Sequence, residues 1–180
     1  ETEPRVRWVK GDVQNREMLD HAMQGVDQVY HLAAYATHWA PDLRIFYRTN
    51  VLGTINVLES ARAADVKRIV VTTTAGVLGP PDPSDVKPID ENHVRLMKFF
   101  NDYEVSKAMV HERVQDYVGS GMDVVLVLPT RIWGPGQMDI KNSISYLFDR
   151  FLKGKVVTVP GTGSEIGNFV HVDDVVEGHV

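Results

Sequence analysis

The chain has 180 residues, 43% of them hydrophobic, and carries a formal net charge of -5 at pH 7 with a pI near 5.8. This is enough for one domain with its own core, and the acidic balance argues against nucleic acid or an anionic membrane as a partner. The absence of cysteine excludes disulfides, thiolate metal sites and a cysteine nucleophile.

No apolar run approaches the roughly 18 residues that a membrane helix needs, and the first residues show no signal-peptide pattern. We therefore expect a soluble, cytoplasmic protein. The chain lacks an initiator methionine, opens almost directly into a strand-like run and stops within a helical pattern at residues 177–180. We expect it to be part of a larger domain.

Five elements are predicted before residue 75. Short runs of apolar and β-branched residues predict strands at 6–9, 27–32 and 67–74, and apolar residues at helical spacing predict helices at 15–23 and 42–64. Gly25 marks the end of the first helix. Gly53 lies inside the second helix, where it costs about 1 kcal/mol relative to alanine.

The second half continues the alternation of helices and strands. Four prolines predict a loop at 79–88, and a long helix that carries Tyr103 and Lys107 follows and extends to about Val118. The remaining predicted elements are a strand at 123–128, a loop at 129–136, a helix at 142–152, strands at 156–159 and 169–172, and a helix that starts at Asp174 with a capping box to Glu177.

Strands that alternate with helices predict a parallel α/β sheet with right-handed crossovers. In such sheets, ligands bind beyond the carboxyl ends of the strands. This rule selects Asp12, the turn at 32–34, the threonines at 72–74 and the loop at 129–136 as the candidate site.

Tyr103 and Lys107 are four residues apart, so on a helix they project from the same face. A cation beside a phenol stabilises the phenolate and lowers its pKa toward a working range for proton transfer. Alternatively, Tyr103 is a packed aromatic residue and Lys107 a solvated charge. Such a pair occurs by chance in roughly a quarter of chains of this composition, although no other tyrosine here has a lysine four residues later.

Thr74 stands at the predicted end of the strand at 67–74, where its hydroxyl would donate a hydrogen bond to a substrate oxygen. The simpler interpretation of three successive threonines is β-propensity. The order of the residues favours a site, because a hydroxyl at a strand end and a later helix with Tyr103 and Lys107 would meet at one carbonyl group.

Two further patterns predict structure rather than chemistry. His171, Asp173 and Asp174 could bind a metal ion, but a strand end that runs into a helix cap explains them, and we expect no metal site. The glycine-rich run at 161–167 is expected to be an ordinary turn, because a strand follows it rather than a helix.

Several motifs in order resemble the extended short-chain dehydrogenase/reductase family, which comprises NAD-dependent epimerases and dehydratases and dihydroflavonol reductases. They are GDV at 11–13, HLAA at 31–34, NVLGTINVLE at 50–59, TTTAGVLG at 72–79, YEVSK at 103–107, LPTRIWGPG at 128–136 and NFVHVDDVVEG at 168–178. Together these motifs cover nearly the whole chain.

The resemblance implies a Rossmann-like, doubly wound parallel sheet and NAD or NADP as cofactor. It implies that Tyr103 is the catalytic acid/base, that Lys107 lowers the pKa of Tyr103 and binds the nicotinamide ribose, and that Thr74 orients the substrate oxygen. The cofactor-binding positions that it implies are Asp12, Val13, Leu32, Ala33, Ala34, Thr72, Tyr103, Lys107 and Pro129. Asn50 matches the family's helix asparagine, either as a relay or in a structural role.

The sequence departs from the family at three points. It lacks the Gly-x-x-Gly-x-x-Gly turn that binds the pyrophosphate, together with the residue that selects NAD or NADP. Arg131 stands where many sugar-nucleotide enzymes have asparagine, and Gly167 where they often have arginine. We interpret residues 1–180 as one partial NAD(P)-binding domain, with a truncated substrate region from about residue 136.

The implied function is that of an oxidoreductase or epimerase acting on a carbonyl or secondary alcohol of a small molecule. Dehydration is least favoured, because no Asp-Glu pair follows Thr74. A reductase-like enzyme and a nucleotide-sugar epimerase stay open, as does a non-catalytic dinucleotide-binding sensor or scaffold. The resemblance also implies a homodimer formed through the helices near 42–64 and 102–118.

Overall fold

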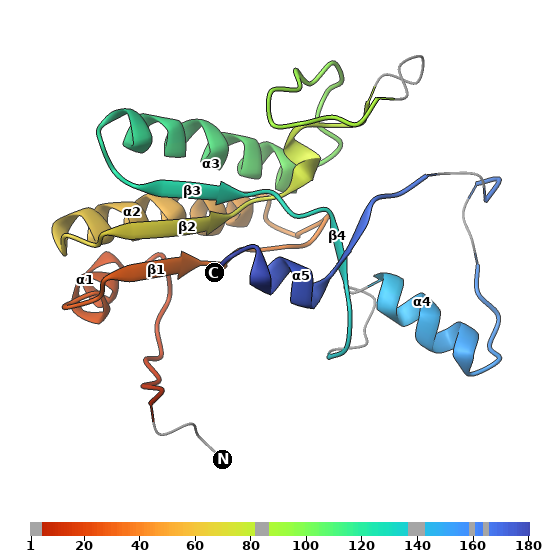
Figure 1. Ribbon diagram of the computed structural model, residues 1–180, viewed down its shortest axis with the longest axis horizontal. Helices are drawn as coiled ribbons and strands as arrows, with labels where there is room; N and C mark the ends of the chain where they lie inside the picture. Colours follow the sequence, from red (N-terminus) through yellow and green to blue (C-terminus); the bar gives the residue numbers. More distant parts are fainter. Residues whose placement is uncertain (1–4, 82–86, 137–142, 159–160, 164–165) are drawn as a thin grey trace.

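The computed structural model describes residues 5–81, 87–136, 143–158, 161–163 and 166–180. Its centre is a parallel sheet in the order β1-β2-β3, formed by β1 (Gln28–His31), β2 (Arg68–Thr72) and β3 (Val124–Val127) (Figure 1). The predicted parallel α/β sheet is therefore confirmed. The predicted strands at 27–32, 67–74 and 123–128 are confirmed as well, each slightly shorter than expected.

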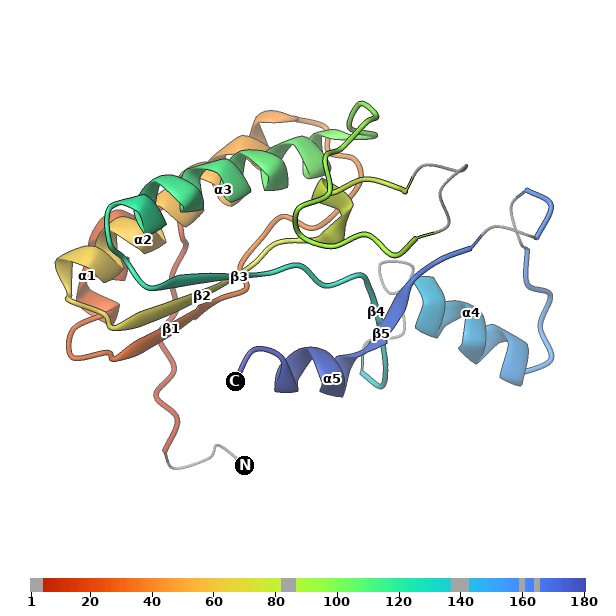
Figure 2. The same ribbon diagram turned by 45° about the horizontal axis from the view of Figure 1, so that its top comes forward.

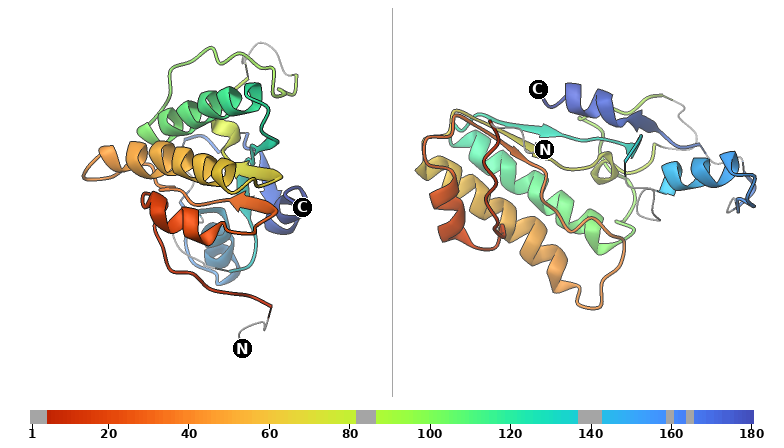
Figure 3. Two further views of the ribbon diagram at one scale, coloured as in Figure 1. Left: turned by 90° about the vertical axis from the view of Figure 1, so that its left-hand side faces the viewer. Right: turned by 90° about the horizontal axis from the view of Figure 1, so that it is seen from below.

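Three helices, α1 (Arg16–Ala22), α2 (Gly53–Ala63) and α3 (Asp102–Gly119), lie on the same face of this sheet (Figure 3). α1 begins as predicted, because the side chain of Asn15 accepts a hydrogen bond from the backbone N–H of Met18 at 3.1 Å. The core between these helices and the sheet consists of Met23, Val51, Val57, Leu58, Ala61, Ile69, Val71, Val110 and Val114. This packing fixes α3 over the carboxyl ends of the strands.

The strand residues alternate between the two faces of the sheet, as the period of a strand requires. Ile69 and Val71 point toward the helices and are fully buried. Val70 lies in register between Tyr30 and Val125, and these two neighbours are 43% and 42% exposed. The face away from α1, α2 and α3 is therefore partly open in the described residues.

The helix predicted at 42–64 exists, but its first half is a π-helix, η1 (Phe46–Leu52), which continues directly into α2. A π-helix has a wider turn than an α-helix and is frequently found at functional sites. This segment contains Asn50, which is buried. The irregular turn therefore coincides with one of the family positions noted in the sequence.

Two predicted strands are wrong. Residues 6–9 and 156–158 form no ladder with any strand in the described part of the chain, and Trp8 is 81% exposed; Val159 lies outside the described residues. A β-prone run becomes a strand only when a neighbouring strand takes up its backbone hydrogen bonds. Local composition alone does not reveal that neighbour.

The predicted loop at 129–136 contains an additional strand. β4 (Arg131–Trp133) pairs in parallel with β5 (Phe169–His171), and this pair lies beyond the carboxyl ends of β1–β3 (Figure 2). The pairing joins segments 38 residues apart, since Arg131 aligns with Phe169. The remaining helices are α4 (Ser143–Leu152), close to the prediction, and α5 (Val172–Glu177).

The predicted capping box between Asp174 and Glu177 is wrong, because α5 begins two residues earlier. His171 is its N-cap, with a ring nitrogen that accepts a hydrogen bond from the N–H of Asp173 at 3.3 Å. Within the glycine-rich run, residues 161–163 form a turn, and residues 164–165 lie outside the description. None of the helices in the described ranges has the length and apolar character needed to cross a membrane.

Candidate active site

The predicted site positions gather where β1, β2 and β3 end. The register pairs His31 with Val71 and Thr72 with Val127, so the three strands finish side by side. The turn at 32–34, the threonines at 72–74 and Pro129 follow these strand ends directly. The backbone N–H of Ala75 donates to the carbonyl of Pro129 at 3.0 Å, which joins the turn after β2 to the segment after β3.

α3 brings Lys107 to this edge. The Lys107 side chain is buried, and its Nζ donates a hydrogen bond to the backbone carbonyl of Thr72 at 2.9 Å. Tyr103 lies one turn earlier on the same helix and is half-buried. The helix starts at Asn101, whose side chain accepts a hydrogen bond from the N–H of Glu104 at 2.9 Å.

The electrostatics at this edge differ from the expected pairing of Tyr103 with Lys107. Burial lowers the pKa of Lys107 to about 8. Burial, and then the carboxylate of Glu104, raise the pKa of Tyr103. The ammonium of Lys107 donates to the carbonyl of Thr72. A lowering of the pKa of Tyr103 by Lys107 stays a prediction.

His31 closes β1 with a buried neutral ring. Burial, and then the ammonium of Lys107, lower the pKa of His31 to about 4. Its Nε2 lies 2.8 Å from the hydroxyl of Thr54, and that hydroxyl donates to the carbonyl of Asn50 at 2.6 Å. Nε2 must therefore carry the proton, and His31 fastens the end of β1 to the start of α2.

Asn50 holds three parts of the site together. Its Oδ1 accepts from the N–H of Tyr35 at 2.7 Å, and its Nδ2 donates to the carbonyl of Tyr35 and to the hydroxyl of Ser106 at 2.8 Å. Ser106 in turn donates to the carbonyl of Tyr103 at 2.8 Å. Of the two roles open for Asn50, these contacts support the structural one.

Thr74 caps a short 3₁₀ turn, η2 (Ala75–Val77). Its Oγ1 accepts a hydrogen bond from the N–H of Gly76 at 3.2 Å. The hydroxyl proton can therefore point to an acceptor in the site. Thr74 is half-buried and precedes Ala75, whose N–H forms the backbone hydrogen bond to Pro129. This position suits a hydroxyl that donates a hydrogen bond to a substrate oxygen.

Val13 lies against the start of α2, and Asp12 precedes it at the surface. Asp12 is exposed, and its carboxylate accepts from the N–H of Gln14 at 2.9 Å. The carbonyl of Val13 accepts from Asn56 at 3.0 Å. A Cβ atom at Gly53 would come within 2.6 Å of the Val13 side chain, so this close approach requires glycine.

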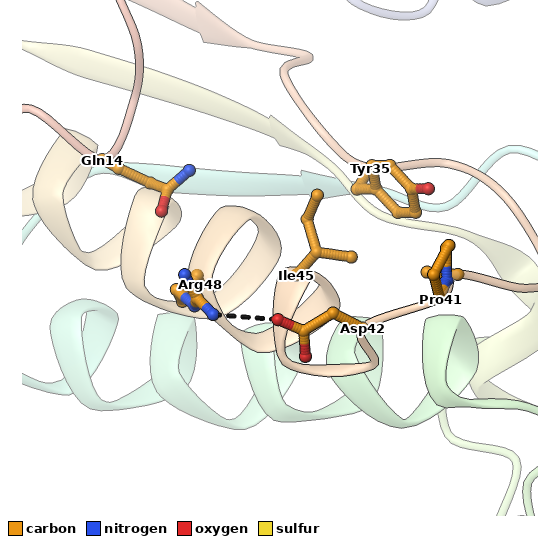
Figure 4. A pocket seen from close by; sticks show the side chains of 7 residues that line it. Gln14, Tyr35, Pro41, Asp42, Ile45 and Arg48 are labelled. Carbon is orange, nitrogen blue, oxygen red and sulfur yellow. Dashed lines mark hydrogen bonds and ion pairs between the residues drawn. The ribbon is translucent and has the colours of Figure 1, made fainter.

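The residues around the strand ends fit a nicotinamide dinucleotide. Leu32 is 60% exposed and Ala33 is exposed, so an open apolar ledge lies beyond β1, suited to a flat ring. Lys107 offers a buried ammonium at the end of β2, and Asp12 offers an exposed carboxylate next to Val13. A cavity of about 250 Å³ lies next to this region and is lined in part by Gln14 and Tyr35. Figure 4 shows these two side chains at opposite ends of the cavity, with Arg48 and Asp42 between them. Arg48 and Asp42 form an ion pair at 3.1 Å.

A larger cavity of about 700 Å³ is lined by Ala75, which follows Thr74, and by Leu128 and Thr130, which flank Pro129. Thr74, Tyr103 and Lys107 are not part of its described lining. Its described lining is mainly apolar and consists of Ala75, Leu78, Gly79, Pro81, Lys87, Pro88, Ile89, Asp90, Glu91, Leu128, Thr130, Ile166 and Asn168. A cavity of this size and character, next to a hydroxyl donor, has the properties of a small-molecule site.

Sequence reasoning missed four side chains at this edge. Arg95 forms an ion pair with Glu104 at 2.8 Å, with the side chains 10% and 15% exposed. Nε2 of His179 lies 2.8 Å from the hydroxyl oxygen of Thr72. The ring of His38 lies edge-on to the ring of Tyr103, with 6.4 Å between the ring centroids. Glu104 lies within a recognised motif, whereas the other three are in segments whose spacing carries no signal.

Comparisons with known proteins agree with this geometry. By sequence, the chain is 34% identical over 170 residues to the 4-hydroxy-2-methyl-3-oxo-4-farnesyl-3,4-dihydroquinoline-1-oxide ketoreductase of Stigmatella aurantiaca, covering 94% of the chain and 49% of that protein. It is 30% identical over 179 residues to the decarboxylating sterol-4-alpha-carboxylate 3-dehydrogenase of Mus musculus, covering 98% of the chain and 48% of that protein. The chain thus spans about half the length of these curated relatives.

Among solved structures, the UDP-glucose 4-epimerase of Thermus thermophilus in complex with NAD superposes with a TM-score of 0.84 at 25% identity. The match covers 99% of this chain and 60% of that one. The predicted Rossmann-like fold is therefore confirmed. The family description "NAD dependent epimerase/dehydratase family" matches residues 1–180, and the chain belongs to that family.

Proposed function

We propose that the protein is an NAD(P)-dependent oxidoreductase that moves a hydride between the nicotinamide and a carbonyl or secondary-alcohol carbon. The observation that supports this most is the meeting at the end of β2, where the ammonium of Lys107 lies 2.9 Å from the carbonyl of Thr72, two residues before Thr74. The bound cofactor would supply or accept the hydride.

In the reductive direction, Tyr103 acts as the acid. Its pKa is raised by burial, so the phenol carries its proton at neutral pH. As the carbonyl carbon gains the hydride, its C–O π electrons move to the oxygen, which takes the proton from the phenol. Thr74 donates a hydrogen bond to the same oxygen, and Lys107 stabilises the phenolate that remains. Oxidation of an alcohol runs through the same steps in reverse.

The cavity beside Thr74 favours an apolar substrate over a sugar nucleotide. Two carboxylates, Asp90 and Glu91, and one ammonium, Lys87, belong to its described lining, with Leu78, Ile89 and other apolar side chains between them. A diphosphate would meet net negative charge there, which disfavours its binding. The names of the ketoreductase and sterol dehydrogenase relatives include a farnesyl group and a sterol skeleton, both of which are largely apolar.

A nucleotide-sugar epimerase is the second candidate. It is supported by the likeness to the UDP-glucose 4-epimerase. The two candidates share the roles of Tyr103, Lys107 and Thr74. They differ in the substrate and in the net reaction, because an epimerase would oxidise and then reduce the same carbon and leave the cofactor unchanged overall. Activity with UDP-glucose, compared with a 3-hydroxysterol and a 3-oxoalkanoate as probes, distinguishes them. We also propose a homodimer and a cytoplasmic location, both of which stay predictions.

The test is Tyr103→Phe in the whole protein. We expect turnover to fall by at least about 100-fold, because proton transfer is lost. Binding of the reduced cofactor, followed by its fluorescence, should be kept. Tyr47→Phe, which removes the hydroxyl of an exposed tyrosine on η1, should leave both unchanged. Undiminished turnover in Tyr103→Phe contradicts the proposal and favours a binding module without catalysis.

A further inference from the structure

Arg95 connects the two parts of the chain that carry the proposed catalytic groups. It lies in the segment between the turn of Thr74 and the start of α3, yet its side chain is only 10% exposed. Its guanidinium also stacks on Phe99, with 4.3 Å from its central carbon to the ring centroid. A long cationic side chain is buried this far only when its donors are satisfied.

Each nitrogen of the guanidinium has a partner. Nε donates to the carbonyl of Met97 at 2.8 Å, and one terminal nitrogen donates to the carbonyl of Gly76. The other terminal nitrogen donates to the carbonyl of Lys98 at 3.0 Å and to the carboxylate of Glu104 at 2.8 Å. The fork geometry of arginine is what allows one side chain to reach these separate acceptors.

These contacts form a continuous link from Thr74 to Tyr103. Gly76 donates its N–H to the hydroxyl oxygen of Thr74 and accepts from Arg95 through its carbonyl. Glu104 pairs with Arg95, accepts from the N–H of Phe100 at 3.1 Å and adjoins Tyr103 in the first turn of α3. A substitution of Arg95 should therefore affect both the turn of Thr74 and the first turn of α3, which carries Tyr103.

Gly76 occupies the narrow space between these ends. A Cβ atom there would lie 3.4 Å from the hydroxyl oxygen of Thr74 and 3.6 Å from a carboxylate oxygen of Glu104. Only a short distance therefore separates the turn after β2 from the first turn of α3. Arg95 bridges the two at this point.

We propose that Arg95 is a positioning residue of this site, which fixes the turn of Thr74 relative to Tyr103 and compensates the carboxylate of Glu104. The inference rests on the proposed function, in which Thr74 and Tyr103 act on one oxygen. It predicts two separable effects, one on the geometry of the site and one on the charge that Tyr103 experiences.

The charged and titratable groups around Tyr103 define what the charge effect is. From α3 they are Asp102, Glu104 and Lys107; from the preceding segment Arg95; and from the segment after β1 His38, whose ring packs on Tyr103. Glu104 opposes formation of the phenolate. Arg95 carries the opposite charge and pairs with Glu104 at 2.8 Å, so we expect it to offset Glu104. Removing Arg95 or Glu104 should thus shift the ionisation of Tyr103 in opposite directions.

The test is an alkaline titration of Tyr103 in the whole protein, followed by phenolate absorbance. The spectrum of each variant is corrected with the same variant carrying Tyr103→Phe, so that the difference isolates one tyrosine. We expect Arg95→Gln to move the ionisation to higher pH and Glu104→Gln to move it to lower pH. Arg113→Gln removes an exposed arginine that pairs with Asp116 on α3, and it should leave the titration unchanged.

Two further variants separate positioning from folding. Arg95→Lys keeps the charge but loses the fork, so we expect the titration to stay near that of the parent while kcat falls on the order of tenfold. Arg95→Gln/Glu104→Gln removes both charges and leaves no unpaired buried ion. If Arg95→Gln does not fold, this double variant replaces it, and its tyrosine should ionise at a higher pH than in Glu104→Gln alone.

The outcomes also separate this inference from the proposed function. Shifts of Arg95→Gln and Glu104→Gln in the same direction, or no shift in either, contradict the role of Arg95. The same holds for the double variant if it titrates no higher than Glu104→Gln. Undiminished turnover in Tyr103→Phe contradicts the proposed function whatever the titrations show, because the titrations require no turnover.

Discussion

The buried ammonium of Lys107 affects catalysis and stability in opposite directions. In the proposed reaction it stabilises the phenolate of Tyr103, which requires a positive charge at the end of β2. Burial of that charge lowers its pKa from 10.5 to about 8. Because the unfolded chain retains the higher pKa, it binds more protons between these two values, and stability rises with pH across that window.

Lys107→Met should remove this pH dependence. The penalty for burying the ammonium is fully present below pH 8 and disappears as the pH rises toward 10.5. Between pH 7.5 and 9.5 we expect the parent to gain up to about 2 kcal/mol in free energy of unfolding relative to Lys107→Met. Denaturant unfolding of both proteins at the two pH values measures this. Equal slopes with pH would show that Lys107 titrates normally in the folded protein.

At the residue scale, the proposed proton-transfer residues can be predicted from the sequence, because they are identified by their spacing within one helix or by their place at the end of one strand. Tyr103 and Lys107 are one helical turn apart, and Thr74 follows a strand that its composition reveals. Arg95 could not be predicted in the same way, because its partners Gly76 and Glu104 lie 19 and 9 residues away across a loop without periodicity. The raised pKa of Tyr103 was also not predictable, since it depends on burial.

At the scale of elements, Gly53 shows how a local cost can serve packing. In the sequence it only weakens a helix. In the structure a Cβ atom at this position would lie 2.6 Å from a methyl group of Val13, so glycine allows the segment of Asp12 and Val13 to pack on α2. The neighbouring Thr54 bonds to His31 at the end of β1. The start of α2 therefore supports both the segment of Asp12 and Val13 and the end of β1, which leads into the turn at 32–34.

Gly53→Ala should destabilise the protein despite the higher helix propensity of alanine. The gain in propensity is about 1 kcal/mol, whereas forcing a methyl group into a packed contact costs about 1–3 kcal/mol. We expect a net loss of free energy of unfolding and weaker cofactor binding, measured by denaturant titration and by fluorescence. Gly119→Ala is the matched control, because a Cβ atom at the end of α3 meets nothing within 4 Å. An equal gain in both variants would contradict this interpretation.

Among the elements, composition predicted the strands of the central sheet and failed for the edges. β2 and β3 are short runs rich in β-branched residues, and the central strand β2 is the most buried of the three. β4 was not predicted, because its residues have the composition of a loop and form a strand only through their pairing with β5. Residues 6–9 look like a strand but have no partner among the described residues. In each failure, a non-local hydrogen-bond partner decided the outcome.

At the scale of the whole molecule, η1, α2 and α3 present the surface that the proposed homodimer would use. A groove of about 340 Å³ lies on it, and its lining combines apolar side chains such as Tyr47 and Met109 with the charged Glu59, Arg62, Arg113 and Asp116. Tyr47 is 46% exposed, and Val105, on the same helix as Met109, is 39% exposed. Burial of such apolar surface would favour association of two copies.

If the protein forms the proposed homodimer, Tyr47→Glu/Val105→Glu should convert it to a monomer. Two charges on the apolar surface would have to be desolvated in the interface, so we expect the dissociation constant to rise by at least about 100-fold. Light scattering over a range of concentrations measures the mass. Trp8→Ser, which alters an exposed aromatic residue outside these helices, should not change it. A parent protein that is monomeric at all concentrations would contradict the dimer.

The hydrogen bond between His179 and Thr72 sets the order in which the site can form during synthesis. The two residues are 107 positions apart, whereas β1, β2 and their helices are close in the chain. A chain emerging from the ribosome can thus pack the helices around β1 and β2 long before α5 exists. The C-terminus of the chain lies near the end of β1 (Figure 1). The hydrogen bond from His179 can orient the hydroxyl of Thr72 only after this last segment has been made. The hydrogen bond at Thr72 therefore forms after the hydrophobic core that supports the site.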